Sequence, residues 1–271
     1  MLRCILKIGS QVEALMRKYS VLALFLSLTM LSGCSIKEKR DGCPCRLFLD
    51  MTSVDAADQV PFVISVFSDE GFEYREIFDS QVFMDTCIVE VPRSELDIVV
   101  WSGGGDYLDD EGLKIPLGEG CPPVFIHQSR VEAKGEAVYD VVRMNKNFCI
   151  LSVNVVEPHE VVSLALRGGV AGYDKGGNPH QGDFHLHSDY DQASSCKFYI
   201  PRQSGTALFL DATESDGMTR TFPLHEYMSE YGYIWDGDQL NDLNMSLEYT
   251  QVGITLTIQG WEEEIVVNVV I

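Results

Sequence analysis

Short runs in which apolar and polar residues alternate are the feature that most restricts the fold of this 271-residue chain. In the clearest run, Val252, Ile254, Leu256 and Ile258 alternate with polar residues that include Thr255, Thr257 and Gln259. Because successive side chains of a β-strand point to opposite faces, this alternation predicts a half-buried strand. Comparable runs occur at residues 47–49, 62–66, 87–91, 98–100, 149–155 and 162–166.

Other segments extend this pattern. Strands are also predicted at residues 124–127, 137–143, 197–201 and 207–212, and a short helix at residues 223–231, ended by Gly232. Two segments lack the alternation and are predicted loops: residues 103–112, and residues 168–194, which are rich in Gly, Asp and His. Many short strands separated by turns predict an all-β sandwich fold.

The alternation breaks at Met144-Asn145-Lys146-Asn147. The parts before and after this break each have about the length of one sandwich domain. We therefore expect an N-terminal β-sandwich over residues 46–146 and a C-terminal β-sandwich over residues 147–271.

The N-terminal segment has the parts of an export signal. Met16-Arg17-Lys18 supplies positive charge, residues 21–30 are apolar but too short to span a bilayer, and Leu31-Ser32-Gly33-Cys34 closes the run. The closing tetrapeptide is a lipobox, at which bacteria attach diacylglycerol to the cysteine and cleave just before it. We expect a signal peptide over residues 1–33, lipidation of Cys34, and a lipidated linker over residues 34–45. An ordinary secretory signal with an unrelated cysteine is the alternative.

The composition is strongly acidic. The chain has 20 Lys and Arg residues against 41 Asp and Glu, a formal net charge of −21 at pH 7. Such a surface repels nucleic acid and anionic lipid headgroups, so nucleic acid is not expected as a partner. The acyl chains on Cys34 would therefore have to hold the protein on its membrane.

Six of the eight cysteines remain after signal removal and lipidation: Cys43, Cys45, Cys87, Cys121, Cys149 and Cys196. An even number in an exported chain permits disulfides. Cys43 and Cys45 are too close for an easy bridge to each other, so one of them is a candidate to pair with Cys121. Cys87 and Cys149 fall on apolar strand faces and are predicted to be buried thiols. No Cys-x-x-Cys spacing occurs, so a zinc site is not expected.

Two polar clusters contain residue types that bind metals. His185 and His187 would share one side of an extended segment, with His180 and Asp183 nearby, and could hold a transition metal. Residues 236–242 are similar to a calcium loop but lack the EF-hand spacing. A solvated loop and a helix cap explain the two clusters better, so neither a metal nor another cofactor is expected. No nucleophile–base set or phosphate loop is present, and an enzyme is not expected.

Residues 265–271 form a nearly unbroken run of β-branched residues. Ile265, Val267, Val269 and Ile271 alternate, so one face of a strand would carry only β-branched side chains. Such a strand is expected to form a hairpin with residues 252–258 inside its own domain. It could also be donated to a second subunit, and these four residues are a candidate partner strand.

Short motifs follow one another in a fixed order along the chain after the signal. They begin with Asp41-Gly42-Cys43-Pro44-Cys45 and continue at residues 100–103, 115–118, 121–124, 143–147, 200–203, 222–224, 231–235 and 257–261. No single motif is diagnostic, but their order and spacing resemble those of the FimB-type fimbrial anchor lipoproteins of Bacteroidales.

The resemblance implies two tandem transthyretin-like β-sandwich domains without catalytic residues. It implies a lipid-anchored protein of the cell outer membrane that holds a fimbria (pilus) to the cell surface and influences its length. A fimbrial shaft subunit (pilin) would be its partner. The chain would stay uncut at Arg40 and at Arg46. The alternative is a stand-alone surface lipoprotein that binds glycan or protein through residues 103–112 and 168–194, where Tyr107, Tyr173 and Tyr190 are the aromatic candidates.

Overall fold

The computed structural model describes residues 43–54, 62–78, 85–156, 161–189, 196–205, 207–230, 232–250, 253–259 and 265–270. For residue 162 and for the described residues after 248, it describes the backbone only. The predicted signal peptide over residues 1–33, the lipid site Cys34, Tyr190 and Ile271 lie outside these ranges. Within them, no helix is long and apolar enough to cross a membrane.

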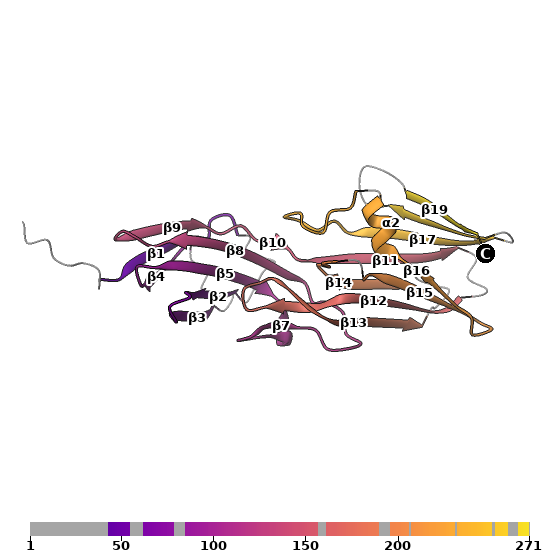
Figure 1. The fold of residues 1–271 in the computed structure, drawn as a ribbon, viewed down its shortest axis with the longest axis horizontal. Helices are drawn as coiled ribbons and strands as arrows, with labels where there is room; N and C mark the ends of the chain where they lie inside the picture. The colour runs from indigo at the N-terminus through magenta and orange to yellow at the C-terminus, as the bar shows by residue number, and fades with distance from the viewer. Residues whose placement is uncertain are drawn as a thin grey trace, which may run out of the picture. The chain divides into compact units, whose positions relative to one another are not determined.

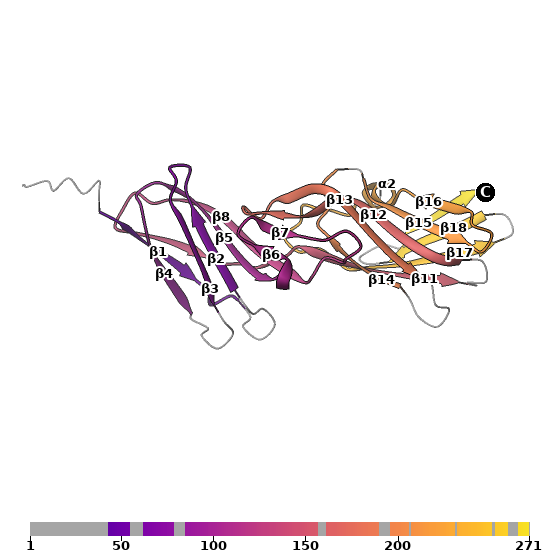
Figure 2. The ribbon, with the colours of Figure 1, turned by 90° about the horizontal axis from the view of Figure 1, so that it is seen from below.

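The strands before residue 147 belong mainly to two sheets (Figures 1 and 2). In the β1 sheet, β1 (Cys45–Asp50) pairs antiparallel with β4 (Thr86–Val91) and parallel with β9 (Ala137–Val141). The β5 sheet is antiparallel, in the order β10 (Asn145–Lys146), β8 (Val124–Glu132), β5 (Glu95–Gly103), β2 (Phe62–Phe67) and β3 (Glu73–Phe78).

The strands after residue 147 belong to two further sheets. The β11 sheet has the order β14 (Cys196–Pro201), β11 (Phe148–Val156), β17 (Leu243–Thr250), β18 (Gly253–Gln259) and β19 (Ile265–Val270). Its pairs are antiparallel except for β11 with β17. The β12 sheet has the order β16 (Thr219–Phe222), β15 (Phe209–Glu214), β12 (Val161–Asp174), β7 (Gly112–Lys114) and β6 (Leu108–Asp109), with β13 (Pro179–Asp189) also paired to β12.

The predicted all-β character is confirmed by these largely antiparallel sheets. Along β4, for example, Cys87, Val89 and Val91 are buried while the residues between them are exposed. The predicted helix corresponds to α2 (Leu224–Glu230), which buries Leu224 and Met228. Period-two alternation therefore identified strands with one buried face.

Two apolar clusters form the core. The first cluster lies between the β1 and β5 sheets and contains Leu47 and Leu49 of β1 with Ile98 of β5. The second cluster contains the inward residues of the β11 and β12 sheets. It also includes Trp101 and Leu113, which precede residue 147 in the chain. One end of the β5 sheet therefore packs with the elements of the second half.

The predicted loop over residues 168–194 is wrong for its described part. Residues 161–174 form β12 and residues 179–189 form β13, and the two pair as a long hairpin. Gly172 has φ +144°, and a Cβ there would come 1.9 Å from the carbonyl oxygen of Leu113. Glycine at position 172 lets the neighbouring strand β7 approach and pair with β12. This glycine therefore marks a close contact between strands and not a loop.

The predicted loop over residues 103–112 is also partly wrong. Residues 105–107 form the 3-10 helix η2, and β6 and β7 form a small hairpin that pairs with β12 through Gly112–Lys114. Gly103, Gly104 and Gly105 all have positive φ, which explains why this stretch looked like a loop.

Candidate interaction surfaces

The last described strand, β19, lies at one end of the strand order of the β11 sheet. It pairs antiparallel with β18, and Val267 and Val269 are the partners of Leu256 and Ile254. The expected hairpin with residues 252–258 is therefore confirmed for the described part, Ile265–Val270. Donation of the candidate partner strand Ile265, Val267, Val269 and Ile271 to another subunit stays a prediction.

A partly buried arginine joins several segments close to residue 147. Arg202 Nε donates to Asn147 Oδ1 (2.9 Å), and its terminal nitrogens donate to the backbone oxygens of Gly237 (2.7 Å), Lys146 (3.3 Å) and Trp235. Burial of the guanidinium lowers the pKa of Arg202, although nearby charges oppose this effect. We call these contacts the Arg202 junction; they hold the end of β14, the β10–β11 connection and residues 235–237 together.

Tyr173 is part of the same network. Its side chain is 1% exposed, and its hydroxyl donates to Asn147 O while accepting from the Arg202 backbone N–H (2.7 Å). Tyr173 is therefore a core residue and cannot serve as an exposed ligand-binding aromatic. Tyr107 is partly buried against the second cluster.

The acidic segment at residues 236–242 has a structural role. Asp242 Oδ1 accepts hydrogen bonds from the Ile150 backbone N–H (2.8 Å) and from Lys146 Nζ (2.6 Å). The segment consists of turns and bends, so the predicted helix cap is wrong. The Asp242 carboxylate instead ties the start of β17 to β11.

The histidines of residues 180–187 lie on β13, not in a loop. His185 and His187 are exposed on one face of the strand because Phe184 and Leu186 point the other way, into the core. His187 Nε2 lies 3.2 Å from Asp189 Oδ1. In the described part of the chain, no three His, Cys, Asp or Glu side chains are grouped so that they could hold a metal ion.

The described cysteines are all free thiols: Cys43, Cys45, Cys87, Cys121, Cys149 and Cys196. Cys45 lies in the first apolar cluster and Cys121 in the second, while Cys43 is exposed. Cys45 and Cys121 therefore do not form a disulfide in this structure, and a pair between Cys43 and Cys121 stays a prediction. Cys87 and Cys149 are buried as predicted; burial raises the pKa of Cys87 to about 11 and that of Cys149 to about 12.

A second histidine environment is buried. His127 Nε2 lies 2.9 Å from Asp140 Oδ2, and its Nδ1 accepts the Arg143 backbone N–H (3.2 Å), so Nε2 carries the proton given to Asp140. Ser129 also donates to Asp140. Burial raises the pKa of Asp140, but these hydrogen bonds outweigh it and the pKa is lowered. In a catalytic triad the imidazole lies between the hydroxyl and the carboxylate. Here the Asp140 carboxylate lies between Ser129 and His127, so the three side chains are not arranged as a nucleophile with its base.

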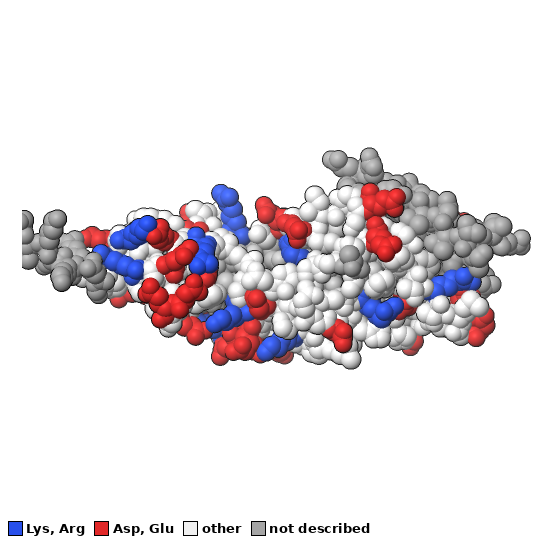
Figure 3. All heavy atoms as spheres, in the orientation of Figure 1, with Lys and Arg blue, Asp and Glu red and all other residues white. Residues whose placement is uncertain are grey.

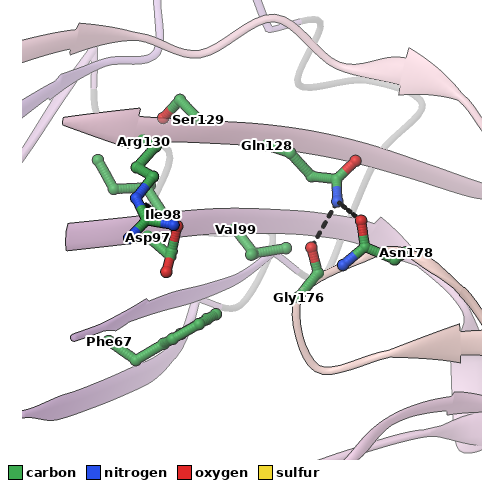
Figure 4. A pocket seen from close by; sticks show the side chains of 9 residues that line it. All are labelled: Phe67, Asp97, Ile98, Val99, Gln128, Ser129, Arg130, Gly176 and Asn178. Carbon is green, nitrogen blue, oxygen red and sulfur yellow. Dashed lines mark hydrogen bonds and ion pairs between the residues drawn. The ribbon is translucent and has the colours of Figure 1, made fainter. Parts of the chain in front are cut away.

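A surface pocket of about 400 Å³ lies over the β5 sheet (Figure 4). Its floor carries Phe67 of β2, Asp97 and Val99 of β5, and Arg130 of β8. Its far side is the β12–β13 turn with Gly176 and Asn178, to which Gln128 is hydrogen-bonded. No sequence motif marks this pocket, because its residues come from three strands and a distant turn.

No family model matches the sequence, and no curated protein does. Solved structures match the fold. The fimbrial anchor protein Mfa2 from Porphyromonas gingivalis aligns with a TM-score of 0.60 at 12% identity, over 84% of this chain and 100% of that chain. A candidate adhesin from Bacteroides ovatus gives 0.58 at 9% identity, over 81% and 95%.

A third solved structure, a candidate polysaccharide-binding protein from Bacteroides thetaiotaomicron, gives a TM-score of 0.56 at 13% identity, over 81% of this chain and 99% of that chain. At such identities the likeness concerns the fold. The chain thus has the β-sandwich fold of Bacteroidales fimbrial anchor and adhesin structures.

Proposed function

We propose that the protein is a non-enzymatic anchor that holds a fimbria at the cell outer membrane. The observation that carries this proposal is the fold shared with the solved chain of the fimbrial anchor protein Mfa2, over 84% of this chain and 100% of that chain. The lipobox ending at Cys34 supports a lipid-anchored location. The net charge of −21 also supports a lipid anchor. Anionic lipids repel an acidic surface, so the surface by itself would not hold the protein on the membrane.

The proposed domain arrangement is two tandem transthyretin-like sandwiches, over residues 46–146 and 147–271. The first cluster fills the space between two sheets of the first half, and most of the second cluster does the same in the second half. An anchor carries tension between the membrane and the fimbria. Pairing of β7 with β12 and the Arg202 junction would pass that tension between the halves.

The proposed partner is a fimbrial shaft subunit. β19 is the candidate contact because, among the described strands of its sheet, it has one neighbour, β18. Extended segments bind exposed sheet edges through main-chain hydrogen bonds, and strand donation uses the same bonds. Influence on fimbria length would follow from ending the stack of subunits at the cell surface.

Replacement of Cys34 tests the anchoring step. Cys34→Ala should abolish fatty-acid labelling and release both the protein and its fimbriae into the medium. Cys43→Ala is the matched control, since Cys43 is an exposed cysteine nearby in the sequence and should leave labelling and retention unchanged. Membrane retention of unlabelled Cys34→Ala protein would show that the anchor lies elsewhere.

Deletion of residues 263–271 tests the partner strand. If β19 is donated, the truncated protein should reach the membrane in normal amounts while fimbriae are shed. If β19 only completes its own sheet, the protein should become unstable and fall in abundance. Normal abundance together with firmly attached fimbriae would contradict both roles.

A further inference from the structure

An exposed apolar row crosses the β1 sheet on the face that points away from the core. Phe48 of β1 is the partner of Ile88 in β4 on one side and of Tyr139 in β9 on the other. The alternate residues of these strands, such as Leu47, lie in the first cluster, so the three side chains point outward. Tyr139 is 72% exposed and Ile88 is 56% exposed, and Phe48 between them is half-buried. The row therefore runs across all three strands of the sheet.

The row is continuous and preformed. The rings of Phe48 and Tyr139 are stacked, with centroids 4.9 Å apart and an interplanar angle of 18°. Val141, further along β9, is also exposed and enlarges the apolar surface. Single exposed apolar side chains are common on protein surfaces, whereas contiguous ones mark interaction sites. A partner could bind this row without ordering it first.

Charged side chains border the row but do not interrupt it. Arg46 and Glu90 are partners on one side of the row, and Asp50 lies on the other side. Asp50 Oδ1 already accepts hydrogen bonds from the backbone N–H (3.0 Å) and the hydroxyl (2.7 Å) of Thr52. Figure 3 shows acidic side chains spread along one face of the described molecule, in keeping with the net charge of −21. The outer face of the β1 sheet, with one cation and two carboxylates, is therefore much closer to neutral.

The chain enters this sheet from the predicted lipid site. β1 begins at Cys45, eleven residues after Cys34, and such a segment spans at most about 40 Å when fully extended. A sheet held this close to a membrane meets it at a high effective concentration, so even a weak contact is populated. The connecting segment is also basic, opposite in sign to the whole chain, and anionic headgroups attract basic segments. Its charged residues are Lys37, Lys39 and Arg40 against Glu38 and Asp41.

We propose that the outer face of the β1 sheet docks on the lipid surface of the membrane that carries the Cys34 lipid. Phe48, Ile88 and Tyr139 would enter the headgroup region, where their apolar surface leaves water. Tyrosine suits this place because its ring is apolar and its hydroxyl is polar. The proposal takes its tether from the proposed lipid anchor and goes beyond that anchor by naming the face of the protein that the membrane contacts.

A synthetic tether tests this contact without natural lipidation. The mature chain carries a histidine tag in place of Cys34 and is attached to vesicles of phosphatidylethanolamine and phosphatidylglycerol that contain a nickel-chelating lipid. A Cys43→Ser background removes the exposed thiol. The environment-sensitive dye NBD is attached through Ala137→Cys, on the exposed face of β9 beside the row, or through Met218→Cys, between β15 and β16. We expect a blue shift of the emission and quenching by spin-labelled lipids at position 137 only, and both should persist in high salt. Because the tag replaces the lipid, a failure of lipidation at Cys34 would not change this result.

Two double variants assign the contact to the row. Ile88→Ser with Tyr139→Ser changes two exposed side chains and should abolish the blue shift at position 137. Ile77→Ser with Ile234→Ser is the matched control and should leave the shift unchanged, because these isoleucines are 61% and 68% exposed and lie outside the β1 sheet.

Three results at position 137 would overturn the proposal: equal emission with and without vesicles, a shift that disappears in high salt, or a shift that survives Ile88→Ser with Tyr139→Ser. A shift lost in high salt would mean that the basic segment alone makes the contact. A dimer of the vesicle-free protein that this double variant dissociates would also overturn it, because the row would then bind a second copy of the chain.

Discussion

Replacing Arg202 with methionine would measure how much the Arg202 junction contributes to stability. The guanidinium donates to Asn147 Oδ1 and to the backbone oxygens of Lys146, Trp235 and Gly237. Methionine keeps much of the apolar stem but has no donor. Four oxygen acceptors would lose their partner at a partly buried position.

The expected cost follows from two opposing effects. A hydrogen bond to a charged group contributes about 1.5–3 kcal/mol, and the 3.3 Å bond to Lys146 O belongs at the weak end. Against this, the variant no longer buries a charge, and that burial is the main cause of the lowered pKa of Arg202. We expect Arg202→Met to lower the free energy of unfolding by about 3 kcal/mol.

Arg167→Met is the matched control. Arg167 makes two hydrogen bonds to Asp211, at 2.6 Å and 3.0 Å, but its side chain is 46% exposed. An exposed ion pair contributes about 1 kcal/mol or less. Urea unfolding followed by the fluorescence of Trp101 and Trp235, both buried, measures the two costs. Equal costs for the two variants would refute the reasoning, because burial would then make no difference.

Three other predictions test separate features. Asp140→Asn should make the protein lose less stability in acid. The pKa of the Asp140 carboxyl is lowered in the folded state, so the carboxylate stabilises the folded protein above the unfolded pKa of about 3.9. That contribution is lost as the pH falls through the folded pKa, and an asparagine at this position has no such contribution to lose. The test is unfolding free energy at pH 5 against pH 3. Gly172→Ala should unfold the protein at lower urea than Gly118→Ala, since both have positive φ but only at Gly172 would a Cβ meet another backbone. Alkylation of the native protein should modify Cys43 quickly and Cys149 only after unfolding, because Cys149 is buried and its pKa is raised to about 12; mass spectrometry reads both rates.

The strands of this fold could be predicted because their signal is local. In β4, and in β11 from Cys149 onward, each buried residue is followed by a more exposed one, and one buried face per sheet produces that pattern directly. The second part of β12 and the whole of β13 were missed because glycine and aspartate are poor strand formers in isolation. Their place is decided by neighbours: Gly172 lets β7 approach, while Phe184 and Leu186 alternate with the histidines that had suggested a loop.

The pocket could not be predicted for a related reason. Phe67, Asp97 and Arg130 become neighbours through the register of three strands, and Asn178 through a turn more distant in the sequence. Each of these residues alone is an ordinary strand or turn residue. A site that is formed by strand register therefore leaves no motif in the sequence. The lipobox leaves one, because its residues are consecutive in the chain.

The position of β19 allows two ways of holding a partner, and they differ in what the anchor loses. If β19 leaves its sheet, one ladder is broken, that between Gly253–Gln259 and Ile265–Val270. Removing β17 instead would break two, with β11 and with β18. If β19 stays, a strand of the partner could add to its outer edge, and the anchor would lose nothing. A disulfide between β18 and β19, through Thr255→Cys and Asn268→Cys at partnered positions, separates these cases. Fimbriae that remain attached under oxidising conditions would show that β19 stays, and fimbriae shed until the bond is reduced would show that it leaves.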